Sequence, residues 1–96
     1  MTSIIAHLNK IFDSRIRLGI MSILLVNDAT DFNTMKELLE LTDGNLATHL
    51  RTLEKAGYIE STKQFIERKP NTRYVITESG KNAFKEHVNA LEKLMS

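Results

Sequence analysis

The stretch NLATHLRTLEKAGYIES, residues 45–61, separates apolar from polar residues at the spacing of a helix. Leu46, Leu50 and Leu53 recur every three or four positions, which places Leu50 and Leu53 within about 40° of Leu46 on a helix that turns about 100° per residue. Gly57 follows them and suits the left-handed position that commonly ends a helix. The stretch therefore predicts a helix over about 44–56 with one buried side.

The side opposite the leucines is small, polar and basic. Its residues, together with those that flank it, are Gly44, Asn45, Ala47, Thr48, Arg51, Thr52 and Lys55. Small side chains near the amino end let a helix enter the major groove of DNA, where arginine or asparagine can reach base edges and lysine can reach phosphate. A solvated side that happens to carry two cations explains the same residues equally well. The neighbouring segments are therefore needed to distinguish a DNA-binding side from an ordinary solvated side.

The segment before this helix predicts a second, shorter helix. Asn33 can cap a helix over about 34–41, and the dipeptide Thr42-Asp43 would end that helix and begin the next. Two helices joined by so short a turn have the sequence form of a helix-turn-helix.

The segment after the helix, YIESTKQFIERKPNTRYVIT, predicts a β-hairpin. Residues 59–65 and 73–77 are rich in β-branched and aromatic side chains, and ERKPNT between them indicates a loop. The hairpin is basic around its tip, where its cations are Lys63, Arg68, Lys69 and Arg73. Such a tip could contact phosphates or the minor groove beside a helix in the major groove. Charged hairpin residues also protect against aggregation, so the hairpin alone is weak evidence for DNA binding.

Two further helices are expected at the start of the chain. Apolar residues at helical spacing indicate helices over about 3–12 and 14–27, and Asp13 or Ser14 can cap the second. The polar run NDATDF that follows indicates a turn.

One helix is expected at the end, capped by Thr77 and running to about Met95. The expected element order is therefore α-α-α-α-β-β-α, a mainly α fold with one β-hairpin. A chain of 96 residues, 42% hydrophobic and 26% charged, is large enough for one such domain, residues 1–96, and too small for two.

Composition excludes several classes of protein. There is no run of about 18 apolar residues, so no membrane span is predicted. The start, MTSIIAHLNK, lacks the basic and apolar regions of a secretory signal. The chain has no cysteine, which excludes disulfides and thiolate metal sites and fits a reducing compartment. A cytoplasmic location is expected.

Charge is unevenly distributed, although the net charge is only +1. Residues 45–75 hold six lysines and arginines against three glutamates, whereas residues 26–44 hold five carboxylates against one lysine. The basic excess coincides with the predicted helix and hairpin. A phosphate-binding surface takes this form in a sequence.

Three segments together resemble a known family: RLGIMSILL (17–25), FNTMKELLELTDGNLATHLRTLEKAGYIE (32–60) and TRYVITESGKNAF (72–84). They are similar to the winged-helix DNA-binding domains of MarR-like and ArsR-like bacterial and archaeal regulators. The similarity is greatest to the small single-domain type with a TDGNLxxHLxxLExAGY signature, and it extends from about Leu8 to Leu94. It implies a winged helix-turn-helix that binds double-stranded DNA as a homodimeric transcriptional regulator, with repression as the expected mode.

The resemblance also implies where DNA is contacted. A recognition helix over about 44–56 would enter the major groove, and a wing over about 64–73 would lie on the backbone or in the minor groove. The residues implied at bases are Asn45, Ala47, Thr48 and Arg51, and those implied on the wing are Arg68, Lys69 and Arg73.

Dimerisation is expected through the terminal helices, about 3–12 and 80–95. One recognition helix reads only a few base pairs, and two of them about 34 Å apart multiply the discrimination. The apolar residues expected at the interface are Ile4, Ile5, Leu8, Phe84, Val88, Leu91, Leu94 and Met95. The alternative is that the last helix only closes the core of its own domain.

No catalytic or metal site and no cofactor is expected. The chain has no nucleophile elbow, glycine-rich phosphate loop or HExxH motif. His7 lies far from the other histidines, and His49, at the edge of the buried side of its helix, is expected to pack rather than to bind a metal. A site that pairs His87 with Glu86 or Glu92 stays open, although no spacing favours it. The cysteine pairs of some ArsR-like metal sensors are absent.

Two other functions stay open at this point. A winged helix can serve protein–protein contact, which would favour an apolar exposed side on the 44–56 helix, whereas that side is polar and basic. A small molecule or metal could alter the dimer from a site between the terminal helices and the core. Fold alone does not decide function, so the polar, basic helix side and the hairpin are the reasons for favouring DNA.

Overall fold

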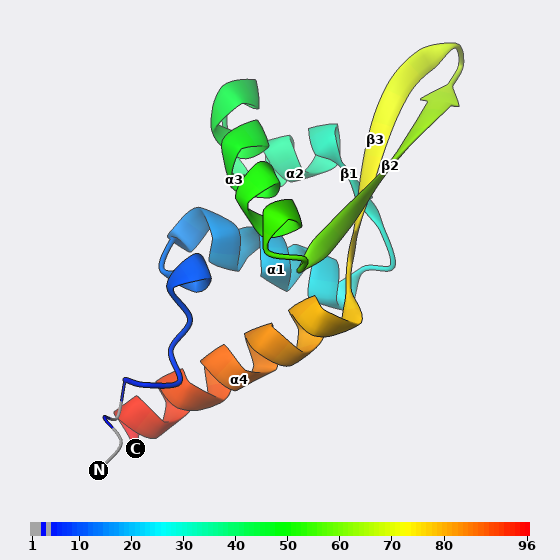
Figure 1. The fold of residues 1–96 in the computed structure, drawn as a ribbon. Coiled ribbons are helices and arrows are strands. Elements are labelled where there is room, and N and C mark those ends of the chain that lie inside the picture. The colour runs from blue at the N-terminus through cyan, green and yellow to red at the C-terminus, as the bar shows by residue number, and fades with distance from the viewer. Residues whose placement is uncertain (1–2, 4) are drawn as a thin grey trace.

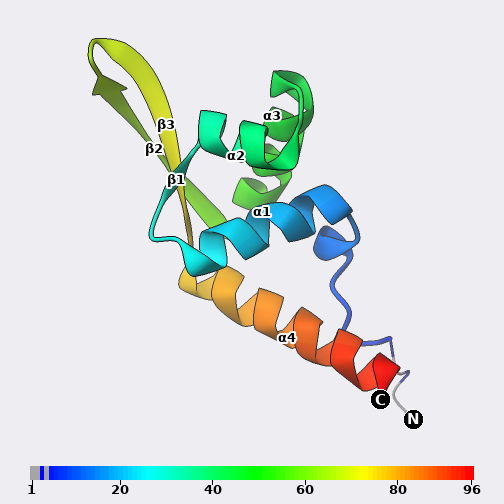
Figure 2. The same ribbon diagram turned by 180° about the vertical axis from the view of Figure 1, so that it is seen from behind.

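A computed structural model describes Ser3 and residues 5–96, which form four α-helices, one 3-10 turn and a three-stranded antiparallel sheet (Figures 1 and 2). The elements in chain order are η1 (Lys10–Phe12), α1 (Arg15–Val26), β1 (Thr30–Asp31), α2 (Phe32–Leu39), α3 (Asp43–Lys55), β2 (Ile59–Ile66), β3 (Lys69–Ile76) and α4 (Glu78–Met95). The sheet has the strand order β1-β3-β2. The predicted architecture is confirmed: α2 and α3 form a helix-turn-helix, and β2 and β3 form the hairpin, or wing, that follows.

Side-chain oxygens cap the amino ends of the helices. Ser14, Thr42 and Thr77 each accept a hydrogen bond from the backbone N–H three residues on, at 3.3, 3.2 and 2.9 Å, and so begin α1, α3 and α4. The cap expected at Asn33 is wrong, because Asp31 caps α2 instead and accepts from the N–H three residues on at 2.8 Å. Each cap satisfies a donor that has no partner inside its helix.

The helix expected over residues 3–12 is wrong in the described part of that range. Residues 5–7 form isolated turns, Lys10–Phe12 forms a short 3-10 helix, and Asn9 between them is extended. The Asn9 side chain accepts from the Ile11 N–H at 2.9 Å, and its backbone N–H donates to Nδ1 of His87, 78 residues away, at 3.0 Å. A long-range hydrogen bond has thus replaced the local helical bond that the spacing predicts.

β1 is a strand that the sequence does not predict. The NDATDF segment is expected to be a turn, yet Thr30 and Asp31 pair antiparallel with β3, opposite Tyr74 and Arg73. Two residues are too few to show a strand periodicity. The strand exists because β3 lies beside it.

The paired strands of the wing extend further toward its tip than predicted, and its turn is tighter. The six-residue loop expected over 67–72 is wrong: β2 and β3 stay paired beyond the predicted strand ends and leave only Glu67 and Arg68 between them. Both turn residues have positive φ, 51° and 67°, as a type I′ hairpin turn requires.

Pro70, expected in the loop, lies in β3 opposite Phe65. Ile66 and Lys69 form the pair that closes the turn, and the Phe65–Pro70 pair is the next one along the ladder. Successive pairs of an antiparallel ladder alternate between hydrogen-bonded and non-hydrogen-bonded, so a residue without an N–H fits beside the closing pair.

The core receives side chains from every helix and from the base of the sheet. The buried apolar residues that cluster there are Phe12, Ile20, Met21, Leu24, Met35, Leu46, Leu50, Leu53, Ile59, Tyr74 and Phe84. The Phe12 ring stacks on Tyr58 with centroids 5.3 Å apart and meets the edge of Phe84 at 5.4 Å. These ring contacts join η1 to the base of the wing and to α4.

α4 begins at a close backbone approach. A Cβ on Gly80 would lie 2.1 Å from the carbonyl oxygen of Tyr58, so only glycine fits there. The Thr77 N–H donates to the same oxygen at 3.0 Å, and the Thr77 hydroxyl donates to the Gly57 carbonyl at 2.6 Å. The start of α4 is thereby fixed against the end of α3 and the start of the wing.

The molecule is elongated, 56 × 25 × 21 Å. The start of α3 and the tip of the wing project at one end, and the carboxyl end of α4 lies at the other (Figures 1 and 2). Among the described residues, no helix combines the length and apolar character that crossing a bilayer requires.

Candidate nucleic-acid interface

α3 buries its leucines and exposes the opposite side, as the sequence predicts. Leu46, Leu50 and Leu53 are 0%, 1% and 0% exposed. The predicted DNA-facing residues lie on the other side: Gly44, Asn45, Thr48, Arg51 and Lys55 are exposed, and Ala47 and Thr52 are half-buried at its edges. The polar side is therefore presented on a helix that the core holds in place.

The end of α3 is locked by backbone hydrogen bonds. Gly57 has the predicted left-handed conformation, with φ of 80°. Its N–H donates to the Glu54 carbonyl at 2.9 Å, and the Tyr58 N–H donates to the Leu53 carbonyl at 3.0 Å. These two bonds form a Schellman motif, which sets the direction in which the chain leaves α3 for the wing.

The turn between α2 and α3 is short because α2 ends in the same way. α2 stops at Leu39, two residues earlier than predicted, and Glu40 takes the left-handed conformation with φ of 53°. The Leu41 N–H then donates to the Lys36 carbonyl at 3.1 Å, and Thr42 caps α3. This turn fixes α3 relative to α2.

The amino end of α3 is open, and its acidic charge is offset. A Cβ added to Gly44 would meet nothing within 4 Å, so no described side chain covers this turn. Asp43 would repel phosphate, but Nζ of Lys36 on α2 lies 2.8 Å from its carboxylate. Both side chains are partly or largely exposed, so the pair adds little stability. Its consequence is electrostatic: Lys36 partly offsets the negative charge at the exposed amino end of α3.

The threonine hydroxyls of α3 donate their hydrogens within the helix. Thr48 Oγ1 donates to the Gly44 carbonyl at 2.9 Å, and Thr52 Oγ1 donates to the Thr48 carbonyl at 3.2 Å. Among the described residues, the side chains of Asn45 and Arg51 make no hydrogen bond. These two side chains therefore keep all their donors for a ligand.

His49 packs on the edge of α3, as expected. Its Nδ1 accepts a hydrogen bond from Nη1 of Arg17 on α1 at 2.8 Å. A guanidinium only donates, so Nδ1 carries no proton in this arrangement. Burial, with the charge of Arg17 as a second cause, holds the pKa of His49 below its ordinary value. The sequence analysis missed Arg17, because no spacing connects residues 32 positions apart.

The basic residues of the wing divide into two groups. Lys63, Arg68 and Lys69 are exposed toward or at the tip. Arg73 is also exposed, but it lies at the base, opposite Asp31 of β1. The Thr34 hydroxyl and N–H lower the pKa of the Asp31 carboxyl, and Asn71 and Arg73 contribute less. Arg73 thus has a carboxylate beside it, whereas the three residues nearer the tip do not pair with one in the described structure.

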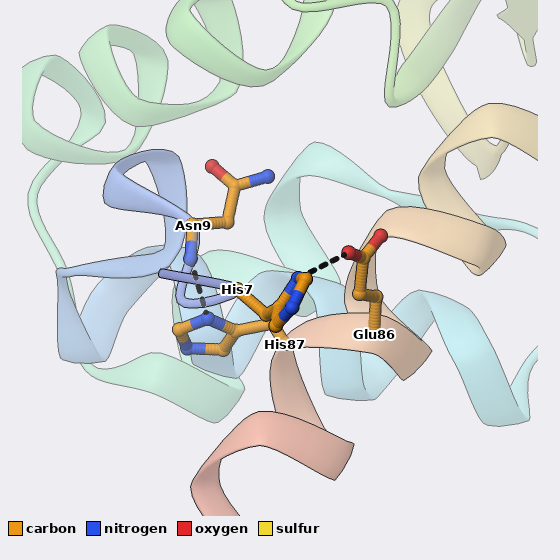
Figure 3. A network of polar contacts seen from close by, with 4 residues as sticks. All are labelled: His7, Asn9, Glu86 and His87. Atoms are coloured by element: carbon orange, nitrogen blue, oxygen red, sulfur yellow. Dashed lines mark hydrogen bonds and ion pairs between the residues drawn. The ribbon is translucent and has the colours of Figure 1, made fainter. Parts of the chain in front are cut away.

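The N-terminal segment is attached to α4 by a polar network (Figure 3). The Asn9 backbone N–H donates to His87 Nδ1 at 3.0 Å, and the Asn9 side-chain amide donates to the Tyr58 hydroxyl at 2.9 Å. His7 Nδ1 lies 3.4 Å from a Glu86 carboxylate oxygen. His87 is 5% exposed and its Nδ1 is occupied, and the described residues contain no group of three metal-ligating side chains.

The residues expected at a dimer interface differ in exposure. Ile5 and Met95 are 59% and 79% exposed and Leu94 is 36%, whereas Leu8, Val88 and Leu91 are half-buried. Phe84 is 5% exposed and packs in the core of its own chain. Ile4 lies outside the described residues. A hollow of about 420 Å³ lies between His7 and α4 and is lined mainly by residues with polar side chains, on the outer side of α4 rather than between α4 and the core.

An exposed polar helix after a short helix–helix turn, with a basic wing at the same end, defines a winged-helix protein of the DNA-binding kind. Residues 16–95 match the family described as winged helix DNA-binding domain, and the chain belongs to that family. It is a winged-helix transcription regulator with DNA as its partner, in a family that is not enzymatic.

The similarity to known proteins covers most of the chain. The uncharacterized protein MJ0432 of Methanocaldococcus jannaschii is 40% identical over 85 residues, which make up 88% of this chain and 92% of the relative. The transcriptional regulator homologue protein from Pyrococcus horikoshii OT3 has a TM-score of 0.84 at 33% identity, covering 91% of this chain and 86% of that one. The YusO protein from Bacillus subtilis has a TM-score of 0.76 at 14% identity, covering 96% and 64%, and supports the fold alone.

Proposed function

We propose that this protein binds double-stranded DNA sequence-specifically, as a homodimer, with α3 in the major groove and the wing on the adjacent backbone or minor groove. The observation that carries the proposal is the exposed, polar and basic side of α3 above three fully buried leucines. A helix with this arrangement can insert into a groove without uncovering its own core.

The exposed residues of α3 differ in which part of the DNA their side chains could contact. Gly44 and Ala47 are small enough to let the backbone approach the floor of the groove, and Asn45 and Arg51 can hydrogen-bond to base edges. Lys55, one turn beyond Arg51, is placed for phosphate. Thr48 and Thr52 would contribute their methyl groups and lone pairs, because their hydroxyl hydrogens are used within the helix.

The wing would contact the DNA outside the groove that α3 occupies. Lys63, Arg68 and Lys69 would bind phosphate, or enter the minor groove, and Arg73 would act closer to the body of the protein. The common orientation of the start of α3 and the wing tip supports simultaneous contact with one duplex (Figure 1).

Dimerisation would use the opposite end of the molecule. Met95, Leu94 and Ile5 expose apolar surface there, with the half-buried Leu8 and Leu91 nearby in sequence. Two copies joined at this end would present two recognition helices to two half-sites of a pseudo-palindromic operator. Phe84 is left out of the proposed interface, because its side chain is used in the core of its own chain.

The finer classification forms part of the same proposal. The sequence resemblance favours a MarR-like or ArsR-like regulator of a single domain, acting in the cytoplasm where the operator would lie. Repression is the favoured mode, because a dimer seated on a promoter excludes polymerase without any further contact.

Fluorescence anisotropy tests DNA binding directly. The full chain is titrated onto a labelled random-sequence duplex at several salt concentrations, while its mass is measured in solution. Six basic residues per chain are candidates for phosphate contact, so a dimer should give a log–log salt slope of roughly −5 to −10. Selection of preferred sequences from a random library then identifies the operator.

The alternatives predict different results. A folded dimer that binds no duplex even at low salt would favour a protein-interaction module. A monomer that binds DNA would contradict the homodimer alone. Transcription in vitro from a promoter carrying the selected operator separates repression from activation.

A further inference from the structure

The tip of the wing carries apolar surface among its charges. Phe65 is 77% exposed, and its cross-strand neighbour Pro70 is exposed as well. Phe65 has no place in the core, since the buried part of the hairpin ends at Ile59 and Tyr74. An exposed aromatic side chain beside a proline, near a two-residue hairpin turn, offers an apolar surface that a partner could cover.

Phe65 lies on the same side of β2 as Ser61, a residue of the wing that contacts α3. Directly opposed residues share a face, and alternate residues along a strand share it too, so Ser61, Lys63 and Phe65 lie on one side of β2. Ser61 Oγ donates to the Glu54 carboxylate on α3 at 3.3 Å. Phe65 therefore sits at the outer end of the side of the wing that begins against α3, with Lys63 between.

The charge around Phe65 favours nucleic acid over an apolar protein surface. The segment from Lys63 to Arg73 carries four cations and one carboxylate, Glu67. A protein partner for Phe65 would have to be apolar and acidic at once. The walls of a DNA groove combine apolar deoxyribose with phosphate, which fits an aromatic side chain flanked by lysine and arginine.

Groove dimensions decide which part of the wing can enter. The major groove, about 12 Å wide, admits a whole β-ribbon, whereas the minor groove, about 6 Å wide, admits only side chains. About six residues separate the buried Tyr74 from the turn, which at about 3.4 Å per residue places the tip roughly 20 Å beyond the core. Half a helical turn of DNA, the step from a major to the neighbouring minor groove, is about 17 Å.

We propose that Phe65, supported by Pro70, packs against the deoxyribose walls of the minor groove next to the major groove that α3 occupies. This contact rests on the proposed function and extends it. It adds an apolar, salt-independent part to binding, beside the phosphate contacts of Lys63, Arg68 and Lys69. Apolar side chains are known to act in minor grooves where proteins bend or widen DNA.

Anisotropy with a labelled duplex of mixed sequence, at several salt concentrations, tests the contact. Phe65→Ala should weaken binding about tenfold, because the substitution removes most of the apolar surface that the side chain would bury against the DNA. The log–log salt slope should stay unchanged, because no cation is lost. Phe65→Leu should keep most of the affinity.

Ile66→Ala is the matched control. Ile66 is the next residue along β2, is 50% exposed, and points to the other side of the ribbon. Its substitution should leave the affinity within about twofold of wild type. Thermal unfolding of each variant verifies that the exposed substitutions leave the fold intact.

Competition with a ligand that fills the minor groove shows whether Phe65 contacts that groove or another part of the DNA. On an A·T-rich duplex saturated with netropsin, wild type and Phe65→Ala should bind with equal affinity, because the groove is filled. If wild type still binds the netropsin-saturated duplex about tenfold more tightly than Phe65→Ala does, Phe65 acts outside the minor groove and the proposal is overturned.

Three further results would also overturn it: a Phe65→Ala protein that binds as wild type does, an equal loss in Ile66→Ala, or a changed salt slope in Phe65→Ala. In each of these cases wild type still binds DNA, and the proposed function stands. A wild-type protein that binds no duplex would overturn both.

Discussion

α3 and the wing present similar side chains at the same end of the molecule, but they are supported in different ways. Beneath the exposed side of α3 lie three leucines with at most 1% of their surface exposed, and both of its ends are closed by capping bonds. On the wing, every residue from Phe65 to Pro70 is exposed. There the ribbon is held by its own strand pairing and its turn.

This difference in support suits the two parts to different kinds of contact with one DNA duplex. Discrimination between bases requires side chains held in a fixed geometry, which a helix anchored in the core provides. A two-stranded ribbon without a core beneath it is more deformable and suits contacts that tolerate variation, such as phosphates and sugar walls. Substitutions of the leucines beneath α3 should therefore act on stability, whereas substitutions on the wing should act on binding alone.

The largest effect is expected from Leu50→Ala, beneath the exposed side of α3. Removing a fully buried leucine side chain should lower the free energy of unfolding by about 2–5 kcal/mol. Urea unfolding followed by circular dichroism measures it. Lys69→Ala, on the exposed wing, should change the same quantity by less than about 0.5 kcal/mol. Equal losses in the two variants would mean that the wing is as firmly supported as α3.

Arg51→Ala tests whether α3 reads bases. The folded variant should lose about 1–3 kcal/mol of binding free energy on the selected operator and less on random duplex, because a hydrogen bond to a base edge is lost. Competition anisotropy with the two duplexes gives the ratio. Lys55→Ala, one turn along, is the matched control and should weaken both duplexes alike. Were Arg51→Ala to do the same, Arg51 would only position the protein.

Lys69→Ala is expected to weaken all sequences alike, by about 1 kcal/mol. Each lost phosphate contact should make the log–log salt slope shallower by about one unit, so a dimer should change by about two. Glu67→Gln removes the single carboxylate of the turn and should strengthen binding slightly. A change in sequence preference in either variant would show that the wing takes part in base readout.

The smallest effect concerns pH and the contact between Arg17 and His49. The pKa of His49 is lowered in the folded state by burial and by the Arg17 charge, so the unfolded state binds the proton more readily. Stability is fully present above the ordinary histidine pKa of 6.5 and falls as the pH drops from there through the folded-state pKa. Melting temperatures at about pH 7.5 and about pH 5.5 should therefore differ more in wild type than in His49→Gln. His7 and His87 are common to both proteins, and an equal pH dependence would contradict this role of His49.

Much of the candidate interface could be predicted from local sequence. The buried leucines of α3, its exposed polar side, the Thr42 and Thr77 caps and the left-handed Gly57 all depend on interactions within about four residues. Helical periodicity and capping are short-range, so a single sequence reports them directly.

Several features could not be predicted, because their partners are distant in the chain. β1 needs β3, more than forty residues away, and Arg17 meets His49 only after α1 and α3 pack. Pro70 and Asn71 suggested a loop, but the turn formed at Glu67 and Arg68, where the strand ladder closes. The exposure of Phe65 could not be predicted, since an aromatic residue in a strand is normally part of a core.

By itself, the sequence determined the helix-turn-helix and the side of α3 that is exposed, because periodicity, caps and charge act over a few residues. Only the tertiary structure decided that residues 5–9 are not helical, that Phe84 belongs to the core, and that the wing tip exposes an aromatic ring. Each of these features depends on which segments, distant in the chain, pack together. Local sequence periodicity cannot predict that packing. The bond from Asn9 to His87 is the plainest case, for it outweighs a helical spacing through a partner 78 residues away.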